Sequence, residues 1–334
     1  MKPTGIILFV ILTLFVAVIS IGLELYQYAL TATGEGDTIR VVWIRPGQSF
    51  SETVTQLRKA GLVRHPNKFR WLARLRGDDR RVRAGEYVLA GSMSPGAILE
   101  TLVKGDVLLH KVLIPEGATV LEIGDILERE GLVSREDFLQ AAFDPGRIRA
   151  LGLEGDTLEG YLFPETYHFP KGVTAEEVIN KMVAQFYLVF TSTWTQRAHA
   201  VDLTIPQVVT LASIVEKETA RSEERPLVAA VFLNRLKRGI RLESDPTVIY
   251  GIKGFDGNLT RKDLQTVTPY NTYKIKGLPP GPIASPGRAS IEAVLYPSDE
   301  SYLFFVSKND GSHHFSLTLH EHNQMVRRYQ LHCP

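Results

Sequence analysis

The first apolar segment of the chain is also its longest. Residues 5–23 carry no charged side chain, and this length approaches the roughly 20 residues that a helix needs to cross the hydrocarbon core of a membrane. The apolar core of a cleaved signal peptide is shorter, about 7 to 15 residues. The pattern therefore favours a retained membrane-spanning anchor within residues 1–30 over a signal peptide or a buried core helix.

Charged residues next to this segment predict its orientation. Lys2 precedes the apolar run, whereas Glu24, Glu35 and Asp37 follow it before the first downstream basic residue, Arg40. Positive charge is retained on the cytoplasmic side of a membrane protein. We therefore expect the N-terminus inside the cell and residues 30–334 outside.

An internal repeat with an offset of 70 residues follows the polar linker Ala32–Asp37. Its first copy carries Ile44, Gly47, Leu57, Gly61, Leu62 and Val63, which recur as Ile114, Gly117, Leu127, Gly131, Leu132 and Val133. Each copy predicts a short strand, a turn and an amphipathic helix ended by glycine. Residues 38–143 are thus expected to form small α+β modules. These are either a scaffold or a glycan-binding module, because fold analogy alone does not decide function.

The periodicity breaks near Asp144–Gly155, and a second domain is expected over residues 156–332. Near its start, Tyr161, Phe163, Tyr167 and Phe169 alternate as in a half-buried strand. Rings of this size usually belong to a core, because each buries a large apolar area. The fold class that these patterns predict is α+β, with an N-terminal transmembrane helix.

Two glutamates mark a helix in this second domain. Thr204 and Pro206 provide its N-cap and first turn, and its apolar stripe runs through Val208, Leu211, Ala212 and Val215. At about 100° per residue, Glu216 and Glu218 lie on opposite flanks of that stripe, so periodicity does not choose between them. Each is either a solvated flank residue or, if buried, a carboxyl group with a raised pKa that can act as a general acid.

Polar residues and turn signals follow the glutamate helix. A second helical pattern begins near Arg225 and ends at Gly239, with Asn234 and Arg235 as polar residues inside its apolar positions. Residues Gly277–Gly287 are rich in proline and glycine and are expected to form a rigid loop.

Composition excludes several classes of protein. The formal net charge is +1, which provides no basic surface for nucleic acid. Cys333 is the only cysteine, so no intramolecular disulfide is possible. The chain has no GxSxG or GxxxxGK pattern. The histidines near the C-terminus lack the i, i+4 spacing of a zinc-binding helix, so no metal or other cofactor is expected.

Several motifs occur in a fixed order along the chain. They are LEGYLFPETY (Leu158–Tyr167), IVEKET (Ile214–Thr219), FLNRL (Phe232–Leu236), SDPTVIYG (Ser244–Gly251), YNTY (Tyr270–Tyr273), GLPPGPIASPG (Gly277–Gly287) and HHF (His313–Phe315). Together they resemble the MltG/YceG family of endolytic murein transglycosylases over nearly the whole chain. The resemblance implies a LysM-like membrane-proximal part and a catalytic domain in which Glu218 is the catalytic residue.

The resemblance also implies a substrate and a location. The substrate is the peptidoglycan strand, cut at the MurNAc–GlcNAc bond with a 1,6-anhydro end as product. The location is the bacterial inner membrane, with the catalytic domain on its outer side. Peptidoglycan synthases are partners that the family suggests. A catalytically inactive, wall-binding scaffold is the alternative.

Substrate-binding residues are expected around Glu218. YNTY combines hydroxyl, amide and aromatic groups, which suit a sugar cleft, so Asn271 and Tyr273 are expected beside Glu218. In the other interpretation Asn271 caps a turn. Two further candidates, Ser244 and Asp245, are expected at the rim, where Asp245 is the possible partner in hydrolysis. His314 is expected to bond locally or to line the substrate groove.

Overall fold

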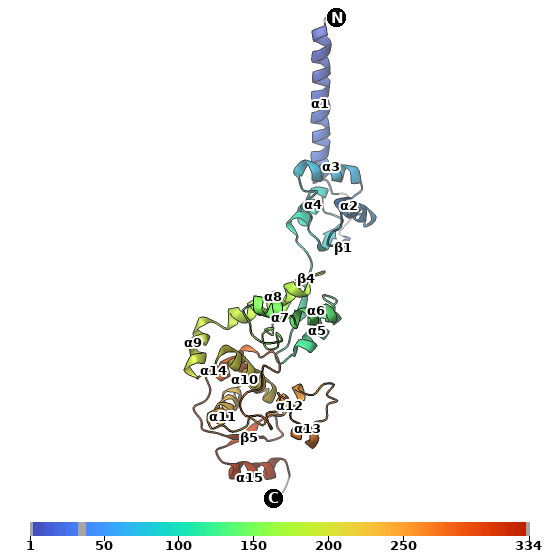
Figure 1. Cartoon of the computed structure of the whole chain (residues 1–334). Coiled ribbons are helices and arrows are strands. Elements are labelled where there is room, and N and C mark those ends of the chain that lie inside the picture. The colour runs from blue at the N-terminus through green and yellow to red at the C-terminus, as the bar shows by residue number, and fades with distance from the viewer. Residues whose placement is uncertain (1–2, 33–37, 332–334) are drawn as a thin grey trace. The chain divides into compact units, whose positions relative to one another are not determined.

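The computed structural model describes residues 3–32 and 38–331 and shows a mixed α+β fold (Figure 1). Most of the predicted linker, residues 33–37, and Cys333 lie outside the described residues. The chain divides into two compact units. Unit 1 comprises Met1–His110 with His168–Gly172, and unit 2 comprises Lys111–Tyr167 with Val173–Pro334.

Unit 1 begins with the long helix α1, Pro3–Leu30. Within its residues 6–30, an 18-residue window has a mean hydropathy of 3.1, so the helix is long and apolar enough to span a membrane. Among residues 6–30 of this helix only Tyr28 and Ala29 are buried, where its last turn packs against α3 and α4 of the same unit. Gly96 of α4 allows this approach, because a Cβ there would lie 2.7 Å from the Ala29 carbonyl oxygen.

The first copy of the repeat follows in unit 1. Its elements are β1 (Ile39–Ile44), α2 (Phe50–Lys59), α3 (Pro66–Arg76) and β2 (Gly85–Ala90), after which comes α4 (Pro95–Lys104). Strands β1 and β2 are antiparallel, with Ile39 opposite Ala90 and Ile44 opposite Gly85. The helices cover this hairpin with a core that includes Leu57, Phe69, Tyr87 and Leu99, all fully buried.

The second copy has the same order of elements. They are β3 (Leu109–Leu113), α5 (Val120–Arg129), α6 (Arg135–Ala142), the added short helix α7 (Pro145–Ala150), and β4 (Thr166–Pro170), which pairs with β3. Capping boxes begin α2 and α5, built on Ser49 and Thr119. The turn before each helix contains a glycine at φ near +75°, Gly47 and Gly117, where other residues are strained. The 70-residue repeat therefore has a structural counterpart.

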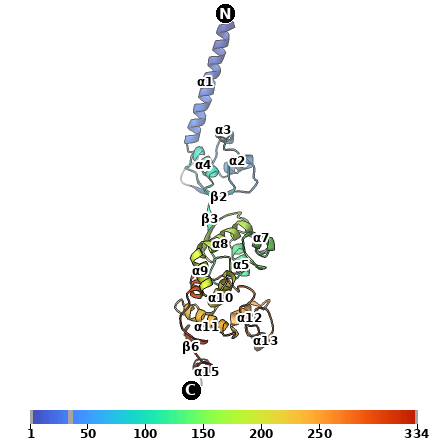
Figure 2. The same cartoon turned by 60° about the vertical axis from the view of Figure 1, so that its left-hand side comes forward.

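The rest of unit 2 is largely helical (Figures 1 and 2). Its elements are α8 (Ala175–Val189), α9 (Ser192–Ala200), α10 (Ile205–Glu218), α11 (Arg225–Lys237), α12 (Asp245–Tyr250), α13 (Arg261–Gln265), α14 (Arg288–Leu295), β5 (Phe304–Ser307), β6 (His313–Ser316) and α15 (Leu319–Tyr329). Helix α10 packs on α11 and α14. Its predicted apolar stripe is fully buried there: Val208, Leu211, Ala212 and Val215.

The compact units differ from the domain division expected near residues 144–155. Backbone hydrogen bonds of 2.8 Å join Gly117 to Ser285 and Ser285 to Ala118, so the turn of the second copy is part of unit 2. The expected strand over the aromatic segment is also shorter, because β4 begins only at Thr166. The four aromatic residues of that segment are buried, at 2–5% exposure, as expected of core residues.

Candidate functional site

A cleft of about 470 Å³ in unit 2 contains the second glutamate of the EKE triplet, Glu218. We call it the Glu218 cleft. The residues that line it are Glu218, Arg235, Leu242, Glu243, Asp245, Tyr273, Phe305, Val306, Ser307, His313, His322, Val326 and Gln330. They come from α10, α11, α12, the loops that follow α11 and α13, the β5–β6 hairpin and α15. One carboxyl group thus faces side chains from much of unit 2.

Glu218 is the last residue of α10. Its Oε1 accepts a hydrogen bond of 2.5 Å from the Ser244 hydroxyl. Burial and the nearby Asp245 charge raise the pKa of Glu218 to about 7, although the Ser244 hydrogen bond and the Arg235 charge act in the opposite direction. A carboxyl group with this pKa is protonated in a large fraction of molecules near neutral pH. It can therefore give up a proton and take one back.

Ser244 and Asp245, at the start of α12, lie beside the Glu218 carboxyl group. Ser244 is the N-cap residue of α12 and is 1% exposed, so it lies inside the protein and not at the rim. Its backbone N–H donates to the Thr272 hydroxyl at 3.0 Å. Asp245 is exposed and accepts a hydrogen bond of 2.8 Å from the Tyr273 hydroxyl. The YNTY and SDPTVIYG motifs therefore meet beside Glu218.

Arg235 explains why a polar residue interrupts the apolar pattern of α11. Its guanidinium is buried and donates to the carbonyl oxygens of Leu303 at 2.7 Å and Leu242 at 3.0 Å. It also pairs with the Glu243 carboxylate at 3.2 Å. The neighbouring Asn234 amide donates to two carbonyl oxygens near the start of β5. Both side chains attach α11 to the wall of the cleft.

Glu216 has a different environment from Glu218. Its side chain is 6% exposed and pairs with Arg225 at 3.1 Å. Its second carboxylate oxygen accepts a hydrogen bond of 2.9 Å from the backbone N–H of Gly287. Glu216 does not line the Glu218 cleft. Contacts with residues distant in the sequence thus give the two glutamates different environments, which periodicity could not distinguish.

Besides Ser244, two more of the expected substrate-binding residues, Asn271 and His314, do not line the cleft. Asn271 is fully buried, and its amide donates to backbone carbonyl oxygens of Asp263, Leu264 and Thr266 at 2.6–3.2 Å. It orders the loop that carries Tyr273, which agrees with the turn-capping interpretation. His314 lies with its ring 6.2 Å from that of Tyr329. Side chains alternate along a strand, so its neighbour His313 faces the cleft instead.

His313 and His322 line the cleft but were not among the substrate-binding residues expected from the sequence. His322 stacks on Phe304 with the ring centroids 5.2 Å apart. Burial and the Arg235 charge lower the pKa of His322. Within residues 3–32 and 38–331 the structure contains no group of three or more metal-ligating side chains. The HHF motif marks the correct strand, but only the register of β5 on β6 shows which histidine points inward.

A second carboxyl group with a raised pKa lies outside the cleft. Glu159, from the LEGYLFPETY motif, is 2% exposed. Its Oε1 accepts a hydrogen bond of 3.0 Å from the first backbone N–H of α5, at Val120, and its Oε2 accepts one of 3.2 Å from the Tyr250 hydroxyl. Burial raises the pKa of Glu159 to about 7 against these hydrogen bonds. Glu159 joins the second repeat copy to the end of α12.

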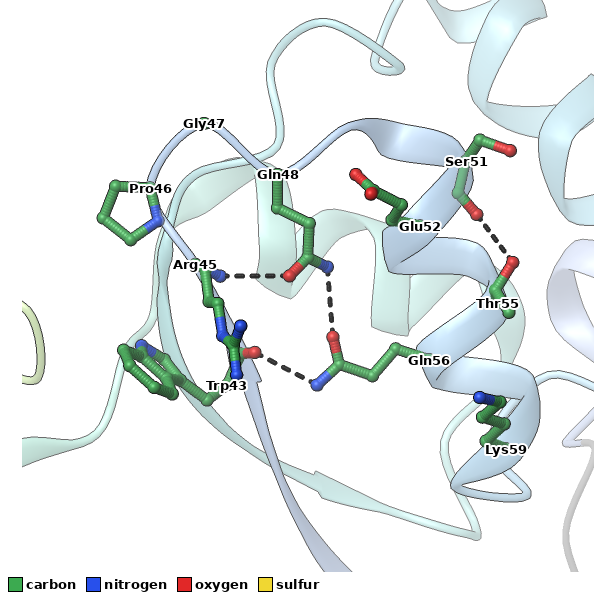
Figure 3. A pocket seen from close by; sticks show the side chains of 10 residues that line it. All are labelled: Trp43, Arg45, Pro46, Gly47, Gln48, Ser51, Glu52, Thr55, Gln56 and Lys59. Carbon is green, nitrogen blue, oxygen red and sulfur yellow. Dashed lines mark hydrogen bonds between the residues drawn. The ribbon is translucent and has the colours of Figure 1, made fainter.

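A groove of about 690 Å³ lies in the first repeat copy (Figure 3). We call it the Trp43 groove. It is lined by Trp43, Arg45, Pro46, Gly47, Gln48, Ser51, Glu52, Thr55, Gln56 and Lys59. The Gln48 amide donates to the Gln56 side-chain oxygen at 3.0 Å, and the Gln56 amide donates to the Trp43 carbonyl at 3.0 Å. The groove thus combines an indole ring with ordered amide groups.

A protonatable carboxyl group in a polar cleft is typical of proteins that catalyse by general acid–base chemistry. A family model described as the YceG-like family matches residues 42–328. The chain belongs to this family, which confirms the resemblance seen in the sequence. A YceG-like protein of Listeria monocytogenes, with a 2.6 Å crystal structure, is 33% identical. That comparison has a TM-score of 0.60 and covers 87% of this chain and 100% of the other.

Two curated relatives carry the same name. The endolytic murein transglycosylase of Bacillus subtilis (strain 168) is 32% identical over 326 residues, which are 92% of this chain and 90% of that protein. The endolytic murein transglycosylase of Streptococcus pneumoniae serotype 2 (strain D39 / NCTC 7466) is 31% identical over 340 residues. That alignment covers 91% of this chain and 61% of the pneumococcal protein.

Proposed function

We propose that the protein is an endolytic murein transglycosylase that cuts the MurNAc–GlcNAc bond inside peptidoglycan strands without consuming water. The relatives of the same name support the reaction class. The observation that carries the proposal for this chain is the position of Glu218, whose pKa of about 7 suits proton transfer in both directions. The buried Ser244 orients this carboxyl group through its hydrogen bond, and the cleft residues Asp245 and Tyr273 are available to orient the substrate.

One carboxyl group is sufficient for the reaction. Neutral Glu218 donates its proton to the departing glycosidic oxygen, and the sugar ring becomes oxocarbenium-like. The C6 hydroxyl of the same muramic acid attacks C1, and the Glu218 carboxylate accepts the hydroxyl proton. The product has a 1,6-anhydro end, and the enzyme returns to its starting protonation state. Hydrolysis instead needs a second carboxyl group to act on a water or as a nucleophile, and Asp245 is the nearest candidate.

The products of digestion distinguish the two reactions. We expect the purified protein to convert glycan strands into shorter strands with anhydro ends. Mass spectrometry measures this directly, because anhydro and hydrated ends differ by one water. Release of hydrated reducing ends alone would show hydrolysis and contradict the proposed lyase reaction.

We further propose that α1 anchors the protein in the bacterial inner membrane, with the N-terminus inside. Its apolar residues from Ile6 to Leu23 are exposed, at 45–70% for the large ones, so they have no protein surface to cover them. The catalytic unit would then lie on the outer side of the membrane, where peptidoglycan strands are made. Peptidoglycan synthases are the partners expected from the family.

The Trp43 groove supports glycan binding by the membrane-proximal, LysM-like part. Aromatic rings with nearby polar groups are typical of sites for polar ligands with apolar faces. The Arg45 guanidinium, drawn in Figure 3, lies 5.5 Å from the centroid of the Trp43 ring. The Lys171 ammonium lies 4.9 Å from the same centroid, so two cationic donors lie next to the ring. This groove is also the feature that favours the alternative function, a wall-binding scaffold.

Replacing Trp43 with alanine tests the groove. We expect Trp43→Ala to weaken binding to insoluble peptidoglycan about tenfold or more, as loss of a central tryptophan does at other interfaces. Co-sedimentation in the Glu218→Gln background measures binding without turnover. Trp71→Ala is the matched control, because Trp71 is 58% exposed on α3 and lies outside the groove. Equal binding by the two variants would leave the groove without a glycan-binding role.

A further inference from the structure

His313 is held by a carboxylate that the catalytic scheme does not use. Its ring Nδ1 lies 2.6 Å from Oε2 of Glu224, and its backbone N–H donates to Oε1 of the same residue at 2.9 Å. The Thr219 hydroxyl, one residue beyond Glu218, also contacts Oε2 at 3.3 Å. One carboxylate therefore fixes both the ring and the main chain of His313 at the start of β6.

The charge of Glu224 determines how the ring is oriented. Burial opposes ionisation of this 7%-exposed residue, but the hydrogen bonds and the charge of His313 outweigh it and lower the pKa of Glu224. An ionised carboxylate only accepts hydrogen bonds. The Nδ1 of His313 must therefore carry a hydrogen, and Nε2 is the ring nitrogen that remains for another contact. Within the described part of the chain, Nε2 makes no hydrogen bond.

The ring of His313 belongs to the wall that faces Glu218. Both residues line the same cleft. Phe305 contacts the imidazole edge-on, with the centroids 5.5 Å apart and the planes at 90°. Packing from Phe305 and the bond to Glu224 thus limit the ring to one orientation. A side chain held in this way is preorganised for binding.

We propose that His313 is a substrate-contacting residue of the Glu218 cleft, which offers its Nε2 to a hydroxyl group of the bound sugar, and that Glu224 is the residue that positions it. This inference rests on the proposed function, because a glycan strand must occupy the cleft. With its hydrogen on Nδ1, a neutral ring accepts a hydrogen bond at Nε2 and a protonated ring donates one. Sugar hydroxyl groups can take either role. If His313 served only to join β6 to the loop after α10, its ring would not need to line the cleft.

Steady-state kinetics on purified glycan strands tests this assignment. Loss of one hydrogen bond to the substrate corresponds to roughly tenfold in binding. We therefore expect His313→Ala to lower kcat/KM about tenfold, mainly through KM, because the contact exists in both the ground state and the transition state. His313→Gln retains an acceptor and should recover part of the loss. It also keeps the test decisive if the alanine variant does not fold.

A double-mutant cycle separates positioning from a structural role for Glu224. If Glu224 acts through His313, Glu224→Gln lowers kcat/KM in the wild-type background but adds nothing in the His313→Ala background. His320→Ala is the control, because His320 is exposed on α15 and lies outside the cleft. Two results would overturn the assignment. One is a double variant whose loss of kcat/KM equals the product of the two single losses, and the other is a His313→Ala loss confined to kcat.

The same experiment distinguishes failure of this inference from failure of the proposed function. If the wild-type protein produces anhydro ends while His313→Ala and His313→Gln keep its full kcat/KM, only the role of His313 is wrong. If the wild-type protein produces no anhydro ends, the proposed function itself fails, and with it the inference that rests on it.

Discussion

Replacing Glu218 with glutamine should lower kcat on glycan strands by about 10² to 10⁴-fold, the contribution typical of a general acid–base group. The amide has the size of the carboxyl group but cannot supply a proton to the leaving oxygen. Burial in the wild-type protein already favours the neutral form of Glu218, so the variant should remain folded. Product analysis with circular dichroism as a folding check measures both outcomes.

Glu216→Gln is the matched control on the same helix. It leaves the buried Arg225 with only its longer ion pair to Glu116, at 3.7 Å. Removal of one member of a buried ion pair typically costs up to about 3 to 5 kcal/mol. We expect lower thermal stability but nearly normal turnover by the molecules that are folded. If instead Glu216→Gln abolished turnover and Glu218→Gln retained it, Glu216 would be the catalytic residue.

The free energy of unfolding should fall as pH rises from about 4.5 to about 7. The pKa of Glu159 is about 7 in the folded protein against a usual value of 4.5, so the folded state holds this proton more tightly than the unfolded state does. Stability from this group is complete below the unfolded pKa and is lost as pH rises through the folded pKa. The loss is on the order of 3 kcal/mol.

Urea denaturation at several pH values measures how the free energy of unfolding changes with pH. Glu218 contributes with the same sign, because its pKa is raised as well. Glu159→Gln should therefore reduce the pH dependence of the free energy of unfolding without removing it. Glu154→Gln, at an exposed glutamate of the same segment, should leave it unchanged. Identical slopes for the wild type and Glu159→Gln would mean that Glu159 titrates near its usual pKa in the folded protein.

Local signals in the sequence predicted the elements well. The cap at Thr204 and the apolar stripe of α10 depend only on neighbours along one helix, and the structure begins that helix at Ile205. The repeat was detectable for the same reason, because each copy carries its own turn glycine and helix cap. These features need no knowledge of distant contacts.

Long-range contacts determined what the sequence left open. The environments of Glu216 and Glu218 differ because Arg225 and Gly287 contact Glu216. The choice between His313 and His314 depends on strand register, with Ser307 opposite His313 and Val306 opposite His314. The division into compact units differs from the break in periodicity because strand β4, at Thr166–Pro170, pairs with β3 across residues 114–165. Pattern alone contains none of these pairings.

The position of Glu218 at the end of α10 affects how strongly this residue holds its proton. The last turn of a helix collects the negative ends of its peptide dipoles, which disfavour a carboxylate nearby. Glu218 occupies that turn, so the backbone itself adds to the proton affinity that burial creates. The residues around the cleft also act on this proton affinity, because Asp245 raises the pKa of Glu218 while Ser244 and Arg235 lower it. A substitution at any of these three residues therefore changes the acidity of Glu218 together with the shape of the cleft, whereas the contribution of the helix terminus stays.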